Sequence, residues 1–218
     1  EHTMALILGW FKNIVYLDSF LKAHRDSREL RYSGGELCGK TAGIIGLGAI
    51  GQRVSSLCRA FGMNVLGYTR HPKFVQGVEA VSLDELLARS DVVSIHVPAT
   101  SETRHMIGRQ AFQKMKPSAV LVNTARGSVV HEEALIEALS DHQIAGACLD
   151  VYEEEPLSQA SRLRELPNVI LTPHTAGYPD GVKLHEKRYS FFSSNIRQAW
   201  SGEMPANLLN RDAWKAWR

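Results

Sequence analysis

The feature that most constrains this sequence is a G-x-G-x-x-G motif at residues 46–51, Gly-Leu-Gly-Ala-Ile-Gly. An apolar run, Thr41–Ile45, precedes it, and a helix-like stretch, Gln52–Phe61, follows it. Between a strand and a helix, such glycines let the backbone approach a pyrophosphate, because they carry no Cβ and the helix amides point at the anion. The third glycine, Gly51, lets helix and strand pack closely. The hexapeptide alone is a weak signal, but in this setting it predicts a dinucleotide-binding turn.

The composition is that of an ordinary globular protein. The chain has 218 residues and a formal net charge of +2 at pH 7, which fits one large domain with appendages. No basic patch for nucleic acid is evident from this balance. Cys38, Cys58 and Cys148 are far apart in apolar surroundings and form no metal-ligand pattern. We therefore expect buried free thiols, no metal site and a cytoplasmic, reducing location.

The N-terminal stretch Met4–Leu21 is apolar, but Lys12, Asn13 and Asp18 interrupt it. A segment that spans a bilayer is therefore not expected, and no basic region precedes the stretch as it would in a secretory signal. Its apolar residues recur at helical spacing, which predicts one long core or interface helix. Because the chain begins at Glu1 and enters this helix at once, we expect it to be a piece of a longer protein.

Downstream, short β-branched or aliphatic runs alternate with amphipathic stretches. Ser82 and Glu85 form a capping box, and His131–Leu139 places its apolar residues on one helix face. This alternation predicts right-handed βαβ crossovers and one doubly wound parallel sheet, an α/β fold of the Rossmann type. The six expected strands are Thr41–Gly46, Met63–Tyr68, Asp91–Val97, Ala119–Asn123, Ile144–Val151 and Val169–Thr172.

The second strand ends where such domains bind the adenosine ribose. An NAD-binding domain usually has Asp or Glu there, whereas this chain has Thr69 and Arg70. No carboxylate is present to repel a 2′-phosphate, and a guanidinium can bind one bidentately, so we expect NADP(H) in preference to NAD(H). The alternative is that Arg70 stacks on adenine or lies in solvent while NAD binds.

Three later strands also end in residues suited to chemistry, and ligands bind at the carboxyl ends of such strands. Arg126 follows the fourth strand, and its planar fork matches a carboxylate or a 2-oxo acid. Asp150 lies at the mouth of the fifth strand, before the acidic run Glu153–Glu155. His174 follows the sixth strand, and histidine exchanges its proton readily near neutral pH.

Four motifs occur here in the order and approximate spacing found in the D-isomer-specific 2-hydroxyacid dehydrogenases, and the chain resembles that family from Glu1 to about Asn207. The four motifs together are a much stronger signal than any one of them. They are Gly-Leu-Gly-Ala-Ile-Gly at 46–51, Asn-Thr-Ala-Arg-Gly at 123–127, Leu-Asp-Val through Glu-Pro at 149–156 and Thr-Pro-His-Thr-Ala-Gly at 172–177.

The resemblance implies that Arg126 binds the substrate carboxylate and carbonyl oxygen, that His174 is the acid/base and that Glu155 orients it. Glu153 and Glu154 are then left as surface charges. The implied cofactor contacts are Gly46, Gly48, Ala49, Ile50 and Gly51 along the pyrophosphate, Thr69 and Arg70 beside the adenosine ribose, Pro98 and Thr103 in the loop after the third strand, Thr124, Ala125, Asp150, Arg126 and His174 around the nicotinamide, and Gly177 closing the loop after His174.

The trio also makes chemical sense without the family. Reduction of a 2-oxo acid requires a hydride at the carbonyl carbon and a proton for the charge that develops on its oxygen. Histidinium can supply that proton, and Arg126 can fix the carboxylate and polarise the carbonyl. A carboxylate on the imidazole, here Glu155, would select its tautomer.

The resemblance also divides the chain. We expect residues 1–30 to form an interdomain or dimerisation helix, residues 31–178 the dinucleotide-binding domain, and residues 179–218 a C-terminal helix and tail that returns toward a second domain. Family members build that substrate-binding domain mostly from residues upstream of this chain. The isolated chain should therefore bind cofactor but turn over poorly, because the missing loops close the cleft against water. The apolar stripe of the first segment favours a homodimer.

The predicted function is hydride transfer between NAD(P)H and a small 2-oxo acid or 2-hydroxy acid, with glyoxylate and hydroxypyruvate as family-level candidates. The expected partner is this substrate, with neither nucleic acid nor membrane. One alternative is a non-catalytic dinucleotide-sensing interaction protein, as corepressor relatives of the family are. Another is a formate- or phosphite-type dehydrogenase of the same superfamily, which shares the histidine and the arginine. The complete set of Arg126, Glu155 and His174 favours an enzyme.

Overall fold

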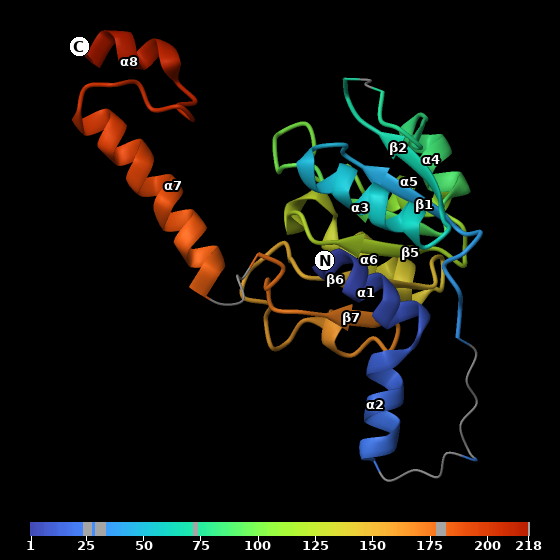
Figure 1. The fold of residues 1–218 in the computed structure, drawn as a ribbon. Coiled ribbons are helices and arrows are strands. Elements are labelled where there is room, and N and C mark those ends of the chain that lie inside the picture. The colour runs from blue at the N-terminus through green and yellow to red at the C-terminus, as the bar shows by residue number, and fades with distance from the viewer. Residues whose placement is uncertain (24–27, 29–33, 72–73, 178–181, 218) are drawn as a thin grey trace. The chain divides into compact units, whose positions relative to one another are not determined.

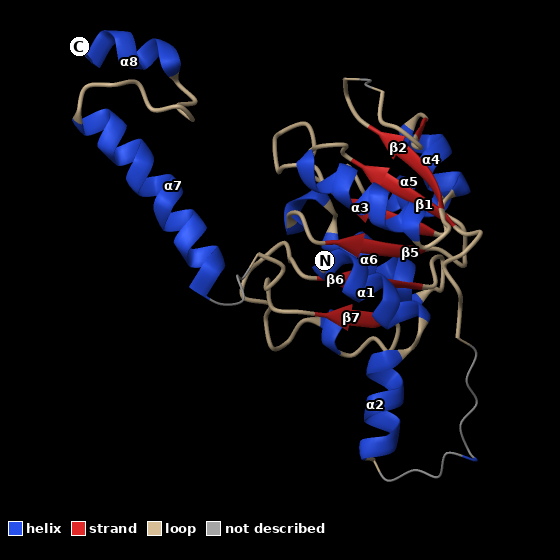
Figure 2. Cartoon of the chain, viewed as in Figure 1, coloured by secondary structure: helices blue, strands red, loops and turns tan. Residues whose placement is uncertain are grey.

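The computed structural model describes residues 1–23, 28, 34–71, 74–177 and 182–217. The chain forms two compact units, Glu1–Ala176 and Gly177–Arg218, and each is described by itself. The first unit contains a sheet with helices on both faces, which Figure 1 shows in chain order and Figure 2 by secondary structure. The second contains α7 (Val182–Trp200) and α8 (Arg211–Trp217).

The sheet of the first unit has seven strands in the order β3-β2-β1-β4-β5-β6-β7. Every pair of neighbours is parallel, so the predicted doubly wound fold is confirmed. All six predicted strands are present, but the prediction missed the edge strand β3, which has two exposed residues and no apolar pattern. The strands are β1 (Thr41–Ile45), β2 (Asn64–Tyr68), β3 (Glu79–Ala80), β4 (Val92–Ile95), β5 (Val120–Asn123), β6 (Gly146–Leu149) and β7 (Val169–Leu171).

The strand order reverses beside β1. From β1 the chain moves outward through β2 to β3, and it then returns to pair β4 with the other side of β1. In a doubly wound sheet, the ligand crevice lies outside the carboxyl ends of the strands at such a switch point. In this sheet the switch point is flanked by the turn after β1 and the loop after β4.

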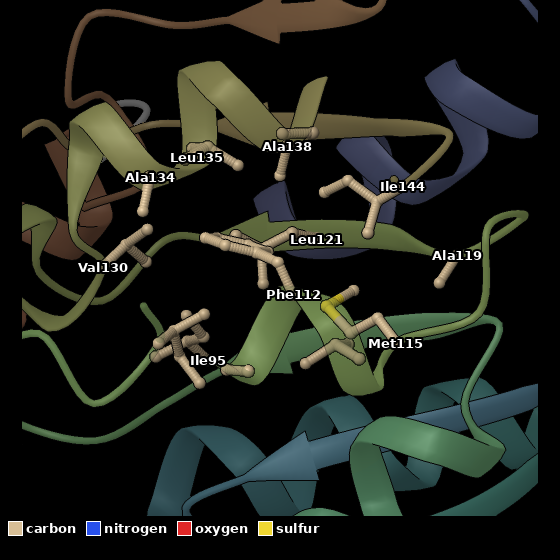
Figure 3. Packing of buried hydrophobic residues seen from close by; sticks show 14 of the residues in the cluster. Ile95, Phe112, Met115, Ala119, Leu121, Val130, Ala134, Leu135, Ala138 and Ile144 are labelled. Atoms are coloured by element: carbon tan, nitrogen blue, oxygen red, sulfur yellow. The ribbon is translucent and has the colours of Figure 1, made fainter. Parts of the chain in front are cut away.

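Helices cover both faces of the sheet. On one face, α1 (His2–Phe11) and α3 (Ala49–Ala60) contribute Ile7 and Val54 to a core with Ile44. On the other, α4 (Leu83–Arg89), α5 (Arg109–Lys114) and α6 (Glu132–Ser140) pack on the sheet. Figure 3 shows Phe112 and Leu135 against Leu121 of β5 in this second core. Because both faces are covered, the strands read as continuous apolar runs.

The prediction of one long N-terminal helix was wrong. The chain breaks at Asn13, which has a left-handed φ of 51°, and α2 (Ile14–Lys22) leaves α1 at an angle of 62°. Asparagine tolerates this conformation better than most residues, while the apolar pattern continues across the break. Among the described residues no single helix is long and apolar enough to cross a membrane, although α1 and α2 together pass that test by composition. The predicted helix also extends over residues 24–27 and 29–30, which lie outside the described residues.

Other local sequence signals, at the helix caps and the cysteines, agree better with the structure. Ser82 caps α4 by accepting the backbone N–H of Glu85 at 3.2 Å, as the capping motif predicted. His131 caps α6 through its ring, which accepts the N–H of Ala134. Cys58 and Cys148 are buried free thiols, but the expectation for Cys38 was wrong because this residue is exposed.

Candidate functional site

The glycine turn follows β1 with the geometry that a pyrophosphate needs. Gly46 has φ +96°, and a Cβ on Gly51 would lie 2.0 Å from the carbonyl oxygen of Gly46, so a larger side chain would force the turn apart. A Cβ on Gly48, by contrast, would meet no atom within 4 Å. Gly48 is the N-cap of α3, no side chain caps the helix, and its first turn has no acidic residue. The first amides of α3 are therefore available to an anion.

Three of the predicted cofactor contacts in the glycine turn are accessible. Gly48, Ala49 and Ile50 are exposed, and Ile50 is 67% exposed although it is a large apolar side chain. Gly46 and Gly51 are buried, so they shape the turn and do not present an open surface. An open glycine at an uncapped helix N-terminus, beside the switch point of the sheet, fits a dinucleotide pyrophosphate. The individual contacts remain predictions.

The predicted adenosine site contains an ion pair that the sequence did not reveal. Thr69 is half-buried and Arg70 is exposed at the end of β2. The Arg70 guanidinium pairs with the carboxylate of Glu102, which belongs to the loop after β4. Because β1 lies between β2 and β4, this pair joins the loops on either side of the strand that ends in the glycine turn.

The loop after β4 is closed by its own side chains. The hydroxyl of Thr103 donates to the carbonyl oxygen of Pro98 at 2.6 Å and accepts the N–H of Thr100 at 2.8 Å. Thr103 therefore shapes the loop in which both predicted cofactor residues lie. Its hydroxyl is already used within the protein, so a cofactor would meet the loop chiefly through its backbone and Pro98.

Arg126 is presented by a turn that a buried asparagine holds. The side chain of Asn123, at the end of β5, donates to the carbonyl oxygen of Arg126 at 2.9 Å and accepts the N–H of Ala125 at 3.1 Å. The guanidinium of Arg126 is exposed and donates to the carbonyl oxygen of Ala125. No carboxylate of the described residues pairs with this guanidinium, so it is suited to binding one from a ligand.

Glu155 and His174 form a contact pair. Nδ1 of His174 lies 2.6 Å from Oε2 of Glu155, and Oε1 of Glu155 accepts the N–H of Tyr152 at 3.1 Å. The side chain of Glu155 is 35% exposed and that of His174 is 44% exposed. With Nδ1 bound to the carboxylate, Nε2 is the ring nitrogen left for a ligand. The structure therefore brings together the acid/base and the orienting partner that the resemblance implied.

Arg126, Glu155 and His174 lie in the loops after β5, β6 and β7, which are consecutive strands of the sheet. In Figure 2 the arrows of β5 and β7 point toward the same side of the unit. Parallel neighbours end at one edge, so the three loops share that edge with the glycine turn.

Asp150 has a structural task that its predicted contact with the nicotinamide carboxamide did not include. Its carboxylate is fully buried and accepts the hydroxyl of Thr172 at 2.6 Å and the N–H groups of Thr175 and Ala176 at 2.8 Å. Burial alone would raise the pKa of Asp150, but these hydrogen bonds and the nearby His2 outweigh it, so the pKa lies below its usual value. Asp150 thus anchors the segment that follows His174, whose φ is +54°.

The start of α1 also reaches this edge, which sequence reasoning missed. Nε2 of His2 lies 3.1 Å from the hydroxyl of Thr172 and 3.4 Å from Asp150 Oδ1. The hydroxyl of Thr3 lies 2.9 Å from that of Thr124, one of the residues expected beside the nicotinamide. These partners are more than a hundred positions apart along the chain, so no local sequence pattern predicts their contacts.

Two further residues have contacts that the sequence did not reveal. Glu153 is exposed, as expected of a surface charge, but it also pairs with His105 and accepts the N–H of Glu132 at 3.2 Å, so it ties the loop after β6 to the start of α6. His96, just after β4, lies 2.9 Å from the hydroxyl of Ser94. Burial, with a smaller contribution from the charge of the amino terminus, lowers the pKa of His96 to about 4.

Gly177 is the first residue of the second unit, in which its carbonyl oxygen accepts a hydrogen bond from Arg188 at 3.3 Å. Its predicted role at the cofactor site stays a prediction. Within the described residues, no group of three or more His, Cys, Asp or Glu is arranged to hold a metal ion.

Residues 4–176 match the model of the D-isomer specific 2-hydroxyacid dehydrogenase family, in its NAD binding domain. The chain belongs to this family. This 2-hydroxyacid dehydrogenase domain is 40% identical over 225 residues to a glyoxylate reductase of Aeropyrum pernix, with 99% of this chain and 67% of that protein covered. It is 42% identical over 215 residues to a D-3-phosphoglycerate dehydrogenase of Methanocaldococcus jannaschii, with 96% of this chain and 40% of that protein covered.

Solved structures similar to this chain have the same fold. The D-lactate dehydrogenase of Aquifex aeolicus, complexed with NAD and lactic acid, superposes with a TM-score of 0.84 at 36% identity and covers 93% of this chain and 66% of its own. An acyclic imino acid reductase in complex with NADPH and D-Arg gives a TM-score of 0.86 at 31% identity, with 95% and 66% covered. The 2-hydroxyacid dehydrogenase domain thus spans about two thirds of the length of these structures.

Proposed function

We propose that this chain is the cofactor-binding part of an NAD(P)H-dependent reductase of small 2-oxo acids. The observation that carries the proposal is the arrangement of Arg126 and the Glu155–His174 pair at the end of three consecutive strands, at the same edge as an open glycine turn. Two of the relatives similar to this chain are named glyoxylate reductases, which favours a short, unbranched 2-oxo acid.

Each of the three residues has a distinct task. The exposed guanidinium of Arg126 would bind the substrate carboxylate and lie near the carbonyl oxygen, which orients the acceptor and stabilises charge that develops on it. Nε2 of His174 would give its proton to that oxygen in the reduction direction. Glu155 holds Nδ1 and so fixes the ring and its tautomer. When bound, the nicotinamide supplies the hydride.

For the cofactor, we favour NADP(H) over NAD(H). Residues 69 and 70 offer a hydroxyl and a guanidinium and no carboxylate, which suits a 2′-phosphate. In the structure Glu102 occupies the Arg70 guanidinium, so a 2′-phosphate would have to displace this carboxylate. An exposed ion pair is worth only about 0–1 kcal/mol, so the displacement costs little.

A homodimer is also part of the proposal. The helix α2 has nine residues, and four large apolar ones are about half exposed or more: Ile14, Val15, Tyr16 and Leu21. Exposed apolar side chains in this number are typical of a surface that pairs with a second copy. Sedimentation at several concentrations tests this, and the double variant Val15→Glu, Leu21→Glu should be monomeric where the parent is dimeric.

The decisive test of the activity follows oxidation of NADPH and NADH with glyoxylate, hydroxypyruvate and pyruvate. It uses this chain and the complete reading frame that encodes it. We expect reduction of glyoxylate or hydroxypyruvate, and we expect Arg126→Ala to abolish it while the control Arg162→Ala, an exposed arginine distant in sequence, does not. If no 2-oxo acid is consumed although both cofactors bind, the dinucleotide-sensing function is the better description.

A further inference from the structure

Tyr152 holds the segment that leads to His174 through its hydroxyl group. The side chain is 7% exposed, and its hydroxyl donates to the carbonyl oxygen of Thr172 at 2.8 Å, with the carbonyl oxygen of Leu149 at 3.3 Å. The same Thr172 oxygen accepts the backbone N–H of His174 at 3.1 Å. The phenol and the His174 amide therefore share one acceptor, two residues before the imidazole.

The backbone of Tyr152 contacts the other two functional loops. Its N–H donates to Oε1 of Glu155 at 3.1 Å, and the other oxygen of that carboxylate binds His174. Its carbonyl group packs on Gly127, where an added Cβ would lie only 1.8 Å from the Tyr152 oxygen. Gly127 directly follows Arg126, so one residue touches the loops that carry all three functional side chains.

The Glu155–His174 contact needs support from outside the pair. Both side chains are more than a third exposed, and an exposed ion pair contributes only about 0–1 kcal/mol, too little to fix two loops. A buried hydrogen bond between the loops adds about 1 kcal/mol of its own and removes rotational freedom from the partners. A phenylalanine ring would fill the same space as the ring of Tyr152. Packing alone therefore does not explain why a hydroxyl group is present at this position.

We propose that Tyr152 is a positioning residue whose hydroxyl, bound to the Thr172 carbonyl oxygen, sets the His174 ring so that Nδ1 meets Glu155 and Nε2 faces the substrate. Burial, followed by the charge of Asp150, raises the pKa of Tyr152 to about 12, so the phenol keeps its proton across the neutral range and remains a donor. The geometric part of this proposal stands without the proposed function, and only the last step, the presentation of Nε2 to a substrate, rests on it.

The test is long-range ¹H–¹⁵N NMR of the imidazole of His174 at pH 9, where the ring nitrogens report the ratio of the two neutral tautomers. The 218-residue chain is compared with Tyr152→Phe, with Glu155→Gln as the reference for a lost carboxylate and Tyr16→Phe, an exposed tyrosine of α2, as the matched control. We expect the ratio of Nδ1–H to Nε2–H to fall about fivefold in Tyr152→Phe, the effect of one neutral hydrogen bond of about 1 kcal/mol. It should fall further in Glu155→Gln and stay unchanged in Tyr16→Phe.

Hydrogen exchange of the buried Ile44 amide in β1 reports global unfolding and separates positioning from general destabilisation. It should rise no more than about fivefold in Tyr152→Phe, the effect of one hydrogen bond of about 1 kcal/mol. The proposal is overturned if Tyr152→Phe leaves the tautomer ratio of His174 unaltered, or if exchange at Ile44 rises more than about tenfold, because the whole sheet would then be destabilised. It is also overturned if Glu155→Gln has no effect, because no pair would then exist to position. Titration of the same samples with NADPH tests the proposed function separately. If NADPH does not bind while the tautomer ratio of His174 behaves as expected, the result counts against the proposed function alone.

Discussion

Nδ1 of His174 lies 2.6 Å from Oε2 of Glu155, and this contact joins the loops after the adjacent strands β6 and β7. The loops are further joined by the Tyr152 hydroxyl and by Asp150, which binds two amides just beyond His174. Buried hydrogen-bonding groups therefore fix the backbone on either side of His174, while its imidazole ring stays accessible. An imidazole that is held in place and still accessible is what proton transfer to a ligand requires.

The substitution Glu155→Gln should lower turnover of glyoxylate about a hundredfold, at the lower end of what acid/base groups contribute. Glutamine has nearly the same shape but no charge, so it can neither stabilise imidazolium nor define the tautomer in the same way. The affinity for NADPH should change less than about twofold, because Glu155 is not among the residues expected to contact the cofactor. Steady-state kinetics and fluorescence titration measure the two quantities. Glu154→Gln, the exposed neighbour, is the control, and an equal loss in both variants would contradict the assigned role.

Gly48→Ala should separate folding from cofactor binding. A Cβ on Gly48 meets no protein atom within 4 Å, so the free energy of unfolding should change by less than about 1 kcal/mol. The new methyl group would occupy the space expected for the pyrophosphate, so dinucleotide affinity should fall at least about tenfold, equivalent to about 1.4 kcal/mol. Urea unfolding and calorimetric titration measure these effects. Gly127→Ala is the opposite case, because its methyl group would overlap the Tyr152 carbonyl and the protein should be strongly destabilised.

The sheet could be predicted because its strands are buried on both faces, which leaves short apolar runs such as Val120–Asn123 that stand out from their surroundings. The glycine turn could be predicted because backbone geometry requires Gly46 and close packing requires Gly51. The edge strand Glu79–Ala80 had no such signal, since it is exposed and only two residues long. The break at Asn13 was hidden because apolar residues occur on both sides of it.

The candidate site was predictable as a set of residues but not as a network. Arg126, Glu155 and His174 follow neighbouring parallel strands, whose order in the sheet places the three loops at one edge. The links that hold them depend on partners distant in sequence, as with His2 and Thr172, which are 170 positions apart. Spacing along the chain carries no information about such contacts, and composition could not predict that Glu153, exposed like its neighbour Glu154, is bound by Glu132 and His105.

His96 should make the protein less stable in mild acid. Its pKa is lowered from 6.5 to about 4, first by burial and then by the charge of the amino terminus. The unfolded chain therefore takes up a proton that the folded chain refuses. The stability that neutral His96 provides is complete above pH 6.5 and is lost as the pH falls toward 4.

Between pH 7 and pH 4.5 the wild-type protein should lose about 2 kcal/mol more unfolding free energy than His96→Asn, since each pKa unit corresponds to about 1.4 kcal/mol. Urea unfolding at intervals of half a pH unit measures the difference, and carboxylates that titrate in both proteins cancel. His71→Asn, which removes an exposed imidazole, should follow the wild type. Parallel curves for wild type and His96→Asn would show that His96 does not resist protonation in the folded state.

Arg70 and Glu102 should set the preference between the two cofactors. Arg70→Ala should weaken NADPH binding about tenfold or more and NADH binding much less, because a hydrogen bond to a charged group is worth about 1.5–3 kcal/mol and only NADPH carries the 2′-phosphate. Glu102→Gln frees the guanidinium and removes a negative charge from the same position, so it should strengthen NADPH binding about threefold, within the range of an exposed ion pair. Fluorescence titration with both cofactors, repeated with 2′,5′-ADP and 5′-AMP, assigns the effect to the phosphate. If the affinities for NADPH and NADH change equally, and those for 2′,5′-ADP and 5′-AMP also change equally, Arg70 contacts adenine. NAD(H) would then be the better assignment.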